Sequence, residues 1–392
     1  MTPQKAHFDE VISSLNWTTK HHTGKAPSIR SISSAVTLLA LLAAGGQAHA
    51  QSSVMIYGSL VDGIVYANNV GGGSVTRLAS GGQWSNNWGL TGTEDLGGGL
   101  KASFNLNSSY NFNTGQTYGT NELWGGAAYV ALGSDKLGTV TLGEQYDYSV
   151  DFVMYSVTAS NTLFAFHPGA YDRIDGVALA NTVSYESPRW AGFRAKAMYS
   201  FGSATSPTNT RRAYSASLDY ENGNFKAEGF TTSVGGNTIT PGTGMGAASF
   251  FGDSLLANQA QSFTLKDTDI YGAAARYDWG KFTFRSVYTK VNWFNDAGTR
   301  SQSLSNAEGS AMYKIQPDLF INAGYTYSWT VGSHWNTYDL SADYFLSKRT
   351  DVMLATNFQH AGGSGTVASL FTIGNSSTQN QLVFYAGIRH FF

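Results

Sequence analysis

Short segments in which apolar and polar side chains alternate recur along almost the whole chain. In "LFINAGYTYSW", residues 319–329, every second residue from Leu319 to Trp329 is apolar or aromatic, and most residues between them are small or polar. "LKASFNLNSSY" (100–110) and "NTYDLSADYFL" (336–346) repeat the pattern. Because successive side chains of a strand point to opposite faces, each segment predicts a strand with one apolar and one polar face.

Composition distinguishes between two folds that such strands could form. One alternating strand fits a soluble β-sandwich as well as a membrane β-barrel. Only 13% of the 392 residues are charged, 14% are aromatic and 45 are Gly, whereas ordinary soluble domains carry roughly 25% charged residues. Polar second faces on so many strands suit a water-filled lumen better than a packed core. The sequence therefore predicts an all-β, antiparallel transmembrane β-barrel.

The number of segments and the connections between them support a barrel. An even strand number lets both chain ends lie on one side of the membrane. Connections alternate between short turns and longer loops, notably 148–180, 235–266 and 362–377. The short turns are "DLGGGL", "SDKLG", "SPRWAG", "ENGN", "DWGK", "QPD" and "SKRTD". About sixteen strands are expected, beginning near Val54, Trp88, Leu100, Leu123, Thr139, Asn181, Phe193, Arg212, Phe225, Thr268, Phe282, Ser303, Leu319, Asn336, Val352 and Thr378.

Aromatic residues gather beside the short turns, where a membrane interface would hold them as a girdle. These residues are Trp190, Phe193, Tyr277, Trp279, Phe282, Phe320, Tyr344 and Phe345. The five prolines after residue 50 all fall in turns or loops, as expected because proline cannot donate to a strand ladder.

The chain ends on the alternating stretch "QLVFYAGIRHFF", residues 381–392, with Phe392 on its apolar face. An open strand edge in lipid would leave backbone groups unsatisfied. We therefore expect this last strand to close against the first, near "VMIYGSLVDGIVY" (54–66). Phe392 should face lipid at the seam and serve barrel assembly.

The N-terminus predicts export. Lys25 and Arg30 precede the apolar run "ISSAVTLLALLAA" (32–44), and Ala48, His49 and Ala50 form an A-x-A cleavage site. About 13 apolar residues fall short of the roughly 20 that a spanning helix needs. Residues 1–50 are therefore expected to be a removed signal peptide with an extended polar start, and residues 51–392 the barrel domain.

Five stretches carry a resemblance to a known family. They are "SSVMIYGSLVDGIVY" (52–66), "WGLTGTEDLGGGLKASF" (88–104), "LWGGAAYVALGSDKLGTVTLGEQYD" (123–147), "NTVSYESPRWAGF" (181–193) and "GIRHFF" (387–392). The chain resembles the trimeric general porins of proteobacterial outer membranes over nearly all of its length after residue 50. The resemblance implies a sixteen-stranded barrel, a homotrimer, and passive diffusion of small hydrophilic solutes and ions. It also implies insertion by the barrel-assembly machinery and a third outer loop, about 148–179, that folds inward and narrows the channel.

The chain departs from that family at the constriction. Where such porins usually carry arginines, it has Asn87, Thr91, Gly126 and Glu144. On the third loop the constriction candidates are Asp151, Asp172, Arg173 and Asp175, and on the wall Glu144, although simple alternation puts Glu144 in phase with the outward row unless a bulge re-aims it. Alternation turns these further candidates into the lumen: Lys101, Arg194, Lys196, Arg276, Arg285, Glu308, Asp339, Asp343 and Arg389. Weak selectivity, near neutral or cation-preferring, is the expectation.

A passive porin is the function that best fits the barrel. An enzyme built on a barrel is disfavoured, since no His lies in a sequence motif typical of catalysis. An adhesin or structural anchor is the alternative, because it could use the long surface loops. The net charge of −2 and the lack of runs of Lys and Arg disfavour binding of nucleic acid. No cofactor or metal is expected, and the predicted surroundings are outer-membrane lipid.

Overall fold

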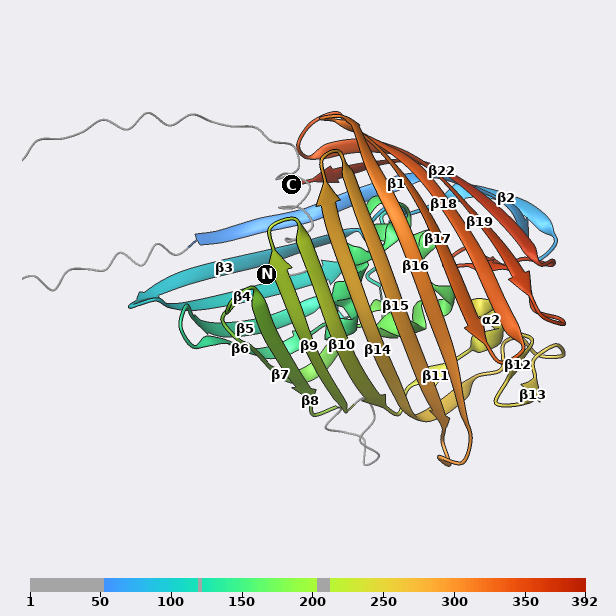
Figure 1. The fold of residues 1–392 in the computed structure, drawn as a ribbon, viewed down its shortest axis with the longest axis horizontal. Coiled ribbons are helices and arrows are strands. Elements are labelled where there is room, and N and C mark those ends of the chain that lie inside the picture. The colour runs from blue at the N-terminus through green and yellow to red at the C-terminus, as the bar shows by residue number, and fades with distance from the viewer. Residues whose placement is uncertain (1–52, 119–121, 203–211) are drawn as a thin grey trace, which may run out of the picture.

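The structure is a computed structural model that describes residues 53–118, 122–202 and 212–392. Sixteen strands form a closed antiparallel barrel, as the alternation and the resemblance predicted (Figure 1). They are β1 (Ser53–Val70), β3 (Asn87–Gly97), β4 (Leu100–Ser109), β5 (Ala127–Ser134), β6 (Gly138–Gln145), β7 (Leu179–Glu186), β8 (Phe193–Ser200), β9 (Ala213–Asn222), β10 (Phe225–Gly235), β14 (Phe263–Trp279), β15 (Phe282–Asn295), β16 (Ser301–Gln316), β17 (Leu319–Thr330), β18 (Ser333–Phe345), β19 (Thr350–Gly362) and β22 (Asn380–Phe391). The predicted signal peptide, residues 1–50, lies outside the described residues and stays a prediction.

The barrel closes where β22 pairs with β1. The ladder runs from Ser59 opposite Phe391 to Ala67 opposite Val383. Beyond it the backbone N–H of Phe392 donates to the carbonyl of Gly58 at 3.1 Å, and the N–H of Gly58 donates back at 3.2 Å. The expected closure of the last strand on the first is confirmed.

Side chains alternate between lipid and lumen as predicted. On β18, Tyr338 is 51% exposed and Leu340 is 53% exposed. Thr337, which precedes Tyr338, and Asp339, which lies between the two, are buried. The apolar row faces the membrane because outside the barrel only lipid surrounds it. The polar row faces inward, and on β18 it carries the charged residues Asp339 and Asp343 into the barrel.

The first strand also pairs with a short strand that sequence reasoning missed. Strand β2 (Gly73–Leu78) folds back on β1 over residues 64–70, and β3 pairs with β1 over residues 53–59. Between these two stretches the side chain of Asn86 replaces a strand partner. It accepts from the N–H of Val61 at 2.5 Å and donates to the Val61 carbonyl at 2.9 Å.

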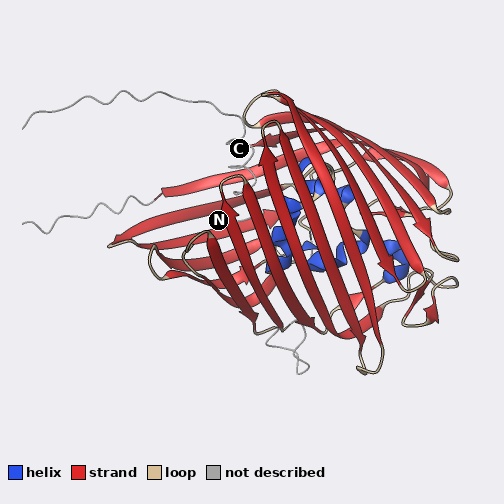
Figure 2. Ribbon diagram, viewed as in Figure 1, coloured by secondary structure: helices blue, strands red, loops and turns tan. Residues whose placement is uncertain are grey.

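The third outer connection folds into the barrel as the resemblance implied. Residues 146–178, here called the inner loop, carry four short 3-10 helices, which Figure 2 shows inside the ring of strands. They are η1 (Tyr148–Tyr155), η2 (Val157–Ser160), η3 (Leu163–Ala165) and η4 (Pro168–Gly176). No helix within the described ranges is long and apolar enough to cross a membrane.

A long connection between β10 and β14 also folds inward. It holds β11 (Thr238–Ile239), α2 (Pro241–Met245), β12 (Ser249–Phe250) and β13 (Asp253–Ser254), and the connection before β22 holds β20 (Ser369–Leu370) and β21 (Gly374–Asn375). Met245, Phe250 and Leu255 are fully buried in one cluster with Trp293 of β15 and Trp335 of β18. We call this cluster the apolar plug. It lies at the long-loop end of the barrel, where it includes side chains of β15 and β18.

Most of the predicted aromatic girdle faces lipid. Trp190 is 79% exposed and Trp279 64%, and Phe193, Tyr277, Phe282 and Tyr344 are exposed as well. The prediction is wrong for Phe320 and Phe345, which are buried in the lumen with ring centroids 5.7 Å apart. Both stand on the inward row of their strands, so alternation outweighs nearness to a turn.

Candidate channel site

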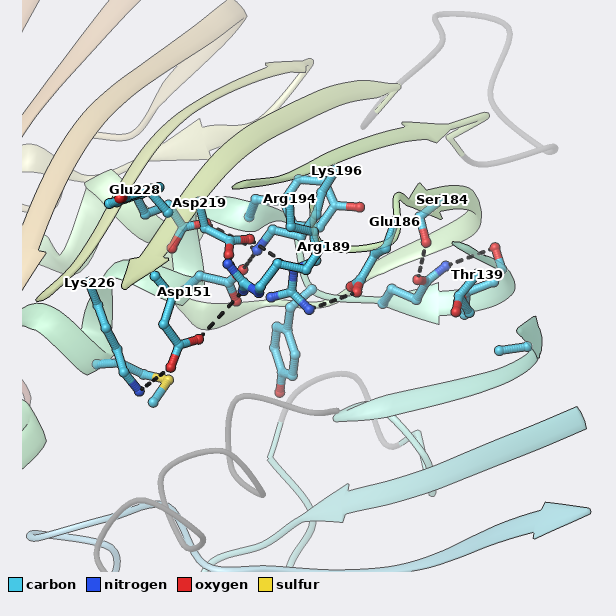
Figure 3. Close-up of a pocket in the computed structure, with 18 of the residues that line it drawn as sticks. Thr139, Asp151, Ser184, Glu186, Arg189, Arg194, Lys196, Asp219, Lys226 and Glu228 are labelled. Atoms are coloured by element: carbon cyan, nitrogen blue, oxygen red, sulfur yellow. Dashed lines mark hydrogen bonds and ion pairs between the residues drawn. The ribbon is translucent and has the colours of Figure 1, made fainter. Parts of the chain in front are cut away.

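An open cavity of about 430 Å³ lies at the short-turn end of the barrel, and we call it the turn-side cavity. Strands β4–β10, β14 and the inner loop line it. Alternation places its charges: on β8, Arg194 and Lys196 point inward while Ala195 and Ala197 face outward. In Figure 3 the charged side chains of β8, β9 and β10, among them Arg194, Asp219 and Glu228, lie close together.

The charges on this cavity are balanced. Five acidic and five basic residues line it: Asp151, Glu186, Asp219, Glu221 and Glu228 with Arg189, Arg194, Lys196, Lys226 and Arg276. Every one of these basic side chains has a carboxylate within ion-pair distance. Arg194, for example, places Nε 2.9 Å from Asp219 Oδ2 and Nη1 3.3 Å from Glu186 Oε2. The lining is therefore formally neutral, and most of its charged side chains form ion pairs with one another.

Lys196 joins the barrel wall to the inner loop. Its Nζ forms an ion pair with the carboxylate of Asp151 in η1 and lies 3.1 Å from Glu228 Oε1 on β10. The ammonium is 4.8 Å from the ring centroid of Tyr148. Two predicted candidates, Lys196 and Asp151, are thus brought together, 45 residues apart in the chain.

A second cavity of about 110 Å³ lies toward the long-loop end, and we call it the loop-side cavity. Among the described residues that line it, Arg173 alone is charged, and its guanidinium carbon lies 3.7 Å from the ring centroid of Phe166. Ala127, Tyr146 and Met154 line both cavities. The two cavities therefore adjoin at these three residues, here called the junction, on the β3–β10 side of the barrel.

The inner loop is anchored to the opposite wall by Glu308 of β16. Glu308 Oε1 accepts from the backbone N–H of Val157 at 2.5 Å, and Oε2 accepts from Ser156 Oγ at 3.2 Å. Glu308 Oε2 is also 3.1 Å from His167 Nε2. This candidate therefore holds the loop, rather than lining either cavity.

Asp172 completes that anchor. Its Oδ2 is 2.5 Å from His167 Nδ1 and accepts from Thr289 Oγ1 at 2.6 Å. Burial alone lowers the pKa of His167, but the carboxylates of Asp172 and Glu308 outweigh it and raise that pKa to about 10. Burial raises the pKa of Asp172, but the His167 cation and the hydrogen bonds outweigh it and hold that pKa below its ordinary value. We call His167, Asp172 and Glu308 the loop latch.

The other candidates line neither of the two cavities. Lys101 is exposed at a short turn, 3.5 Å from Asp135, and Arg285 is buried on the inner face of β15. Asp339 is buried and accepts from Asn357 Nδ2 at 2.6 Å.

Arg389 and Asp343 belong to a separate cluster at the closing strand. Arg389 Nε is 2.9 Å from Asp351 Oδ1, its Nη2 is 3.6 Å from Asp343 Oδ2, and Gln83 Nε2 donates to Asp351 Oδ2 at 2.6 Å. The side chain of Asp175 lies outside the described part of the structure.

Glu144 is not placed at the channel. It pairs with Ala128 across the β5–β6 ladder and shares the outward row with Val140 and Leu142, which are 44% and 52% exposed. Its neighbour Gln145 points inward and lines the turn-side cavity. A bulge does follow Gly143 on the side of β7. It does not re-aim Glu144, so the structure gives no support to a constriction role for this residue.

Sequence reasoning missed several residues of the site. Asp219 and Glu228 stand on inward rows that the alternation rule would have found. Arg189 lies in a turn and Tyr155 in the inner loop, where no periodicity applies. Nothing in the sequence distinguishes Tyr129 of β5 and Tyr146 at the junction, because tyrosines are common throughout the chain.

A closed barrel with an apolar outer row, a largely polar inner row and an open cavity lined by charged side chains defines the class of outer-membrane channel proteins. The comparison with known families is specific: residues 35–364 match the Gram-negative porin family, and the chain belongs to that family. It is accordingly a protein of the outer membrane.

Two relatives share sequence with the chain. Outer membrane porin protein 32 of Delftia acidovorans is 34% identical over 176 residues, which cover 42% of this chain and 48% of that protein. The match thus spans about half the length of this relative. An outer membrane porin protein of Bordetella pertussis (strain Tohama I) is 28% identical over 294 residues, covering 67% of this chain and 71% of that protein.

Solved structures share the fold. An anion-selective porin from Comamonas acidovorans superposes with a TM-score of 0.69 at 22% identity, covering 87% of this chain and 100% of that one. OmpT of Vibrio cholerae, in a trimer form, gives a TM-score of 0.65 at 13% identity, covering 87% and 99%. At such identities the likeness concerns the fold alone.

Proposed function

We propose that the protein forms a water-filled channel for the passive diffusion of small hydrophilic solutes and ions. The observation that carries the proposal is the turn-side cavity, which polar and charged groups line and which adjoins the more apolar loop-side cavity. A sieve of this kind works through pore size and the charges and hydrogen-bonding groups that line it.

Weak charge selectivity belongs to the proposal. The turn-side cavity carries equal numbers of acidic and basic side chains, and the loop-side cavity carries Arg173. Charges within a Debye length of roughly 8 to 10 Å act on a passing ion, so paired charges largely cancel. The chain also lacks arginine at positions 87, 91, 126 and 144.

An enzymatic role is not part of the proposal. His167 is the histidine nearest to a catalytic arrangement, with carboxylates at both ring nitrogens. It is only 2% exposed, so no solute reaches it, and a cation held between two carboxylates is a poor general base.

An adhesin role has less support than a channel. The connection between β10 and β14 was the loop best suited to binding at the surface. Its apolar residues Met245, Phe250 and Leu255 are instead buried in the apolar plug.

The proposed assembly is a homotrimer in outer-membrane lipid, inserted by the barrel-assembly machinery. The trimer form of OmpT from Vibrio cholerae, which shares this fold, and the family resemblance support the oligomeric state. Light scattering of the detergent-extracted protein tests it, and a monomeric mass would contradict it.

Single-channel recording in planar bilayers tests the channel itself. We expect stable conductance steps that grow in proportion to KCl concentration, and a reversal potential near zero across a KCl gradient. The absence of any conductance from correctly folded protein would overturn the proposal.

A further inference from the structure

The turn-side cavity is lined by tyrosine rings as well as by charges, and one of these rings, Tyr146, belongs to the junction with the loop-side cavity. Tyr129 of β5, Tyr146 before η1 and Tyr155 of η1 line the turn-side cavity together with Met154. Tyr146 and Met154 also line the loop-side cavity. A solute in the turn-side cavity therefore meets three tyrosine rings, and at the junction it meets the ring of Tyr146.

The hydroxyl groups of these tyrosines are available to a solute. In the part of the chain that the structure describes, Tyr129, Tyr146 and Tyr155 make no hydrogen bond to the protein through their hydroxyls. All three side chains are half-buried. Burial raises the pKa of Tyr146 to about 12, more than the nearby Arg173 lowers it, so its hydroxyl keeps its proton. Partly buried hydroxyls without protein partners bind water or whatever displaces it.

The surroundings disfavour a charged occupant. Each basic residue of the turn-side cavity already has a carboxylate partner, and Lys196 is shared between Asp151 and Glu228. A charged solute would have to replace such a pair, and stripping a partner from a buried charge is costly. A neutral solute can instead form hydrogen bonds with the outer atoms of the ion-paired side chains and leave the pairs intact. Ser103 of β4 and Thr141 and Gln145 of β6 add neutral hydrogen-bonding groups to the lining.

We propose that Tyr129, Tyr146, Tyr155 and Met154 form a transit site for neutral sugars in ring form. The proposal rests on the channel function proposed above. A sugar ring offers an apolar C–H face that packs on an aromatic ring, and hydroxyls at its edge that exchange hydrogen bonds with tyrosine and with charged side chains. A cavity of about 430 Å³ lies within the usual range for small-molecule sites, roughly 300 to 1,000 Å³. Binding is weak enough to let the sugar leave, as conduction requires.

Titration of the ion current tests the site. Glucose is added to purified protein in a planar bilayer, and the fall in KCl conductance is followed with concentration. We expect a saturable fall with glucose, and only the small linear fall due to viscosity with sorbitol, which has nearly the same size and hydroxyl count but no ring. Gluconate and glucosamine, charged relatives of glucose, should bind more weakly than glucose.

Variants connect the effect to the tyrosines. Tyr155→Ala, which removes the ring, should raise the half-saturating glucose concentration roughly fivefold or more, and Tyr155→Phe, which removes only the hydroxyl, by about two- to threefold. Tyr271→Ala on the lipid-facing row, 46% exposed, is the matched control and should change nothing. Tyr155→Phe keeps the packing and remains informative if the alanine variant fails to assemble.

The outcomes separate the two proposals. A conducting channel on which glucose and sorbitol act alike, or whose glucose titration is unchanged in both Tyr155 variants, would overturn the sugar site and leave the channel standing. Stronger saturation by glucosamine or gluconate than by glucose would also overturn it, because the site would then select charge. Correctly folded protein without conductance would overturn both.

Discussion

The ring of Phe392 covers Gly58 across the seam of the barrel. A Cβ atom built at Gly58 would lie 2.6 Å from Phe392 Cζ and 2.5 Å from the carbonyl oxygen of Asn87. Glycine at this position therefore makes the notch that receives the terminal ring. Phe392 is 41% exposed and so faces lipid while it packs on the first strand.

Both partners of this contact should be needed for assembly. Gly58→Ala forces the Phe392 ring or the β3 backbone aside, and deletion of Phe392 removes two backbone hydrogen bonds at the seam. We expect each change to lower the amount of folded barrel in the membrane without altering the conductance of channels that form. Heat-modifiable mobility on gels measures the first and single-channel recording the second. Normal yield in both variants would rule out a role for the contact in assembly.

The side chain of Asn86 should stabilise the first strand. It is fully buried and makes two hydrogen bonds to the backbone of Val61 in the stretch between the β2 and β3 ladders. Asn86→Ala leaves the buried N–H of Val61 unpaired, at about 1 to 3 kcal/mol, whereas the Val61 carbonyl keeps the hydrogen bond from the Gly81 N–H at 3.0 Å. Urea unfolding of the variant should show a loss of that order. Asn107→Ala, at another buried lumen amide whose contact with β1 is a hydrogen bond to the Tyr57 hydroxyl at 3.0 Å, is a comparison expected to cost less.

The loop latch should keep the inner loop in place over a wide pH range. The pKa of His167 is raised to about 10, so its cation contributes fully below its ordinary pKa of roughly 6.5 and is lost as pH rises through 10. The pKa of Asp172 is lowered, so its contribution is present above its ordinary pKa of about 3.9 and is lost as pH falls through the lowered value. We expect steady single-channel current at neutral pH and increased fluctuations above about pH 10.

Replacing His167 should make the channel fluctuate at neutral pH as the unmodified channel is expected to do above about pH 10. His167→Ala leaves Asp172 and Glu308 as neighbouring buried carboxylates, and breaking a buried pair in this way costs about 3 to 5 kcal/mol. Noisy channels at pH 7 are the expected result. His390→Ala, at an exposed histidine of β22, is the control. Quiet channels in the His167 variant would show that the loop is held by its other contacts.

Charge selectivity should respond to Asp151 and not to Glu144. Asp151→Asn leaves Lys196 with Glu228 alone and makes the lining of the turn-side cavity net positive, so the reversal potential across a KCl gradient should shift toward anions. Glu144→Gln changes the same charge on the outward row and should leave the potential unchanged. Equal shifts in the two variants would contradict the placement of Glu144.

Processing remains a prediction of the sequence alone. If Ala48, His49 and Ala50 form the cleavage site, protein from the outer membrane should begin at Gln51. Intact mass spectrometry measures this directly. A mass that includes residues 1–30 would contradict the signal peptide.

Alternation was enough to predict the strands and their faces, because a period of two is a local property of the chain. It placed Lys196, Arg276 and Asp343 inside the barrel and, taken strictly, placed Glu144 outside. It could not predict which inward charge meets which. Glu308 and His167 are 141 residues apart, and their contact depends on how far the inner loop reaches across the lumen. The apolar plug was missed for the same reason, since a loop that folds inward has no periodicity to reveal it.

The strands of the barrel differ in length, and the difference bears on the bilayer around it. Strands β5–β8 have eight residues each, whereas β14, β15 and β16 have 17, 14 and 16. Eight residues rise roughly 26 Å, and a tilt of about 40° leaves roughly 20 Å across the membrane, less than the apolar band of about 25 Å usual for such barrels. Lipid against this side must thin locally, which carries a free-energy cost from hydrophobic mismatch. That cost falls when another protein surface, rather than lipid, covers the short wall.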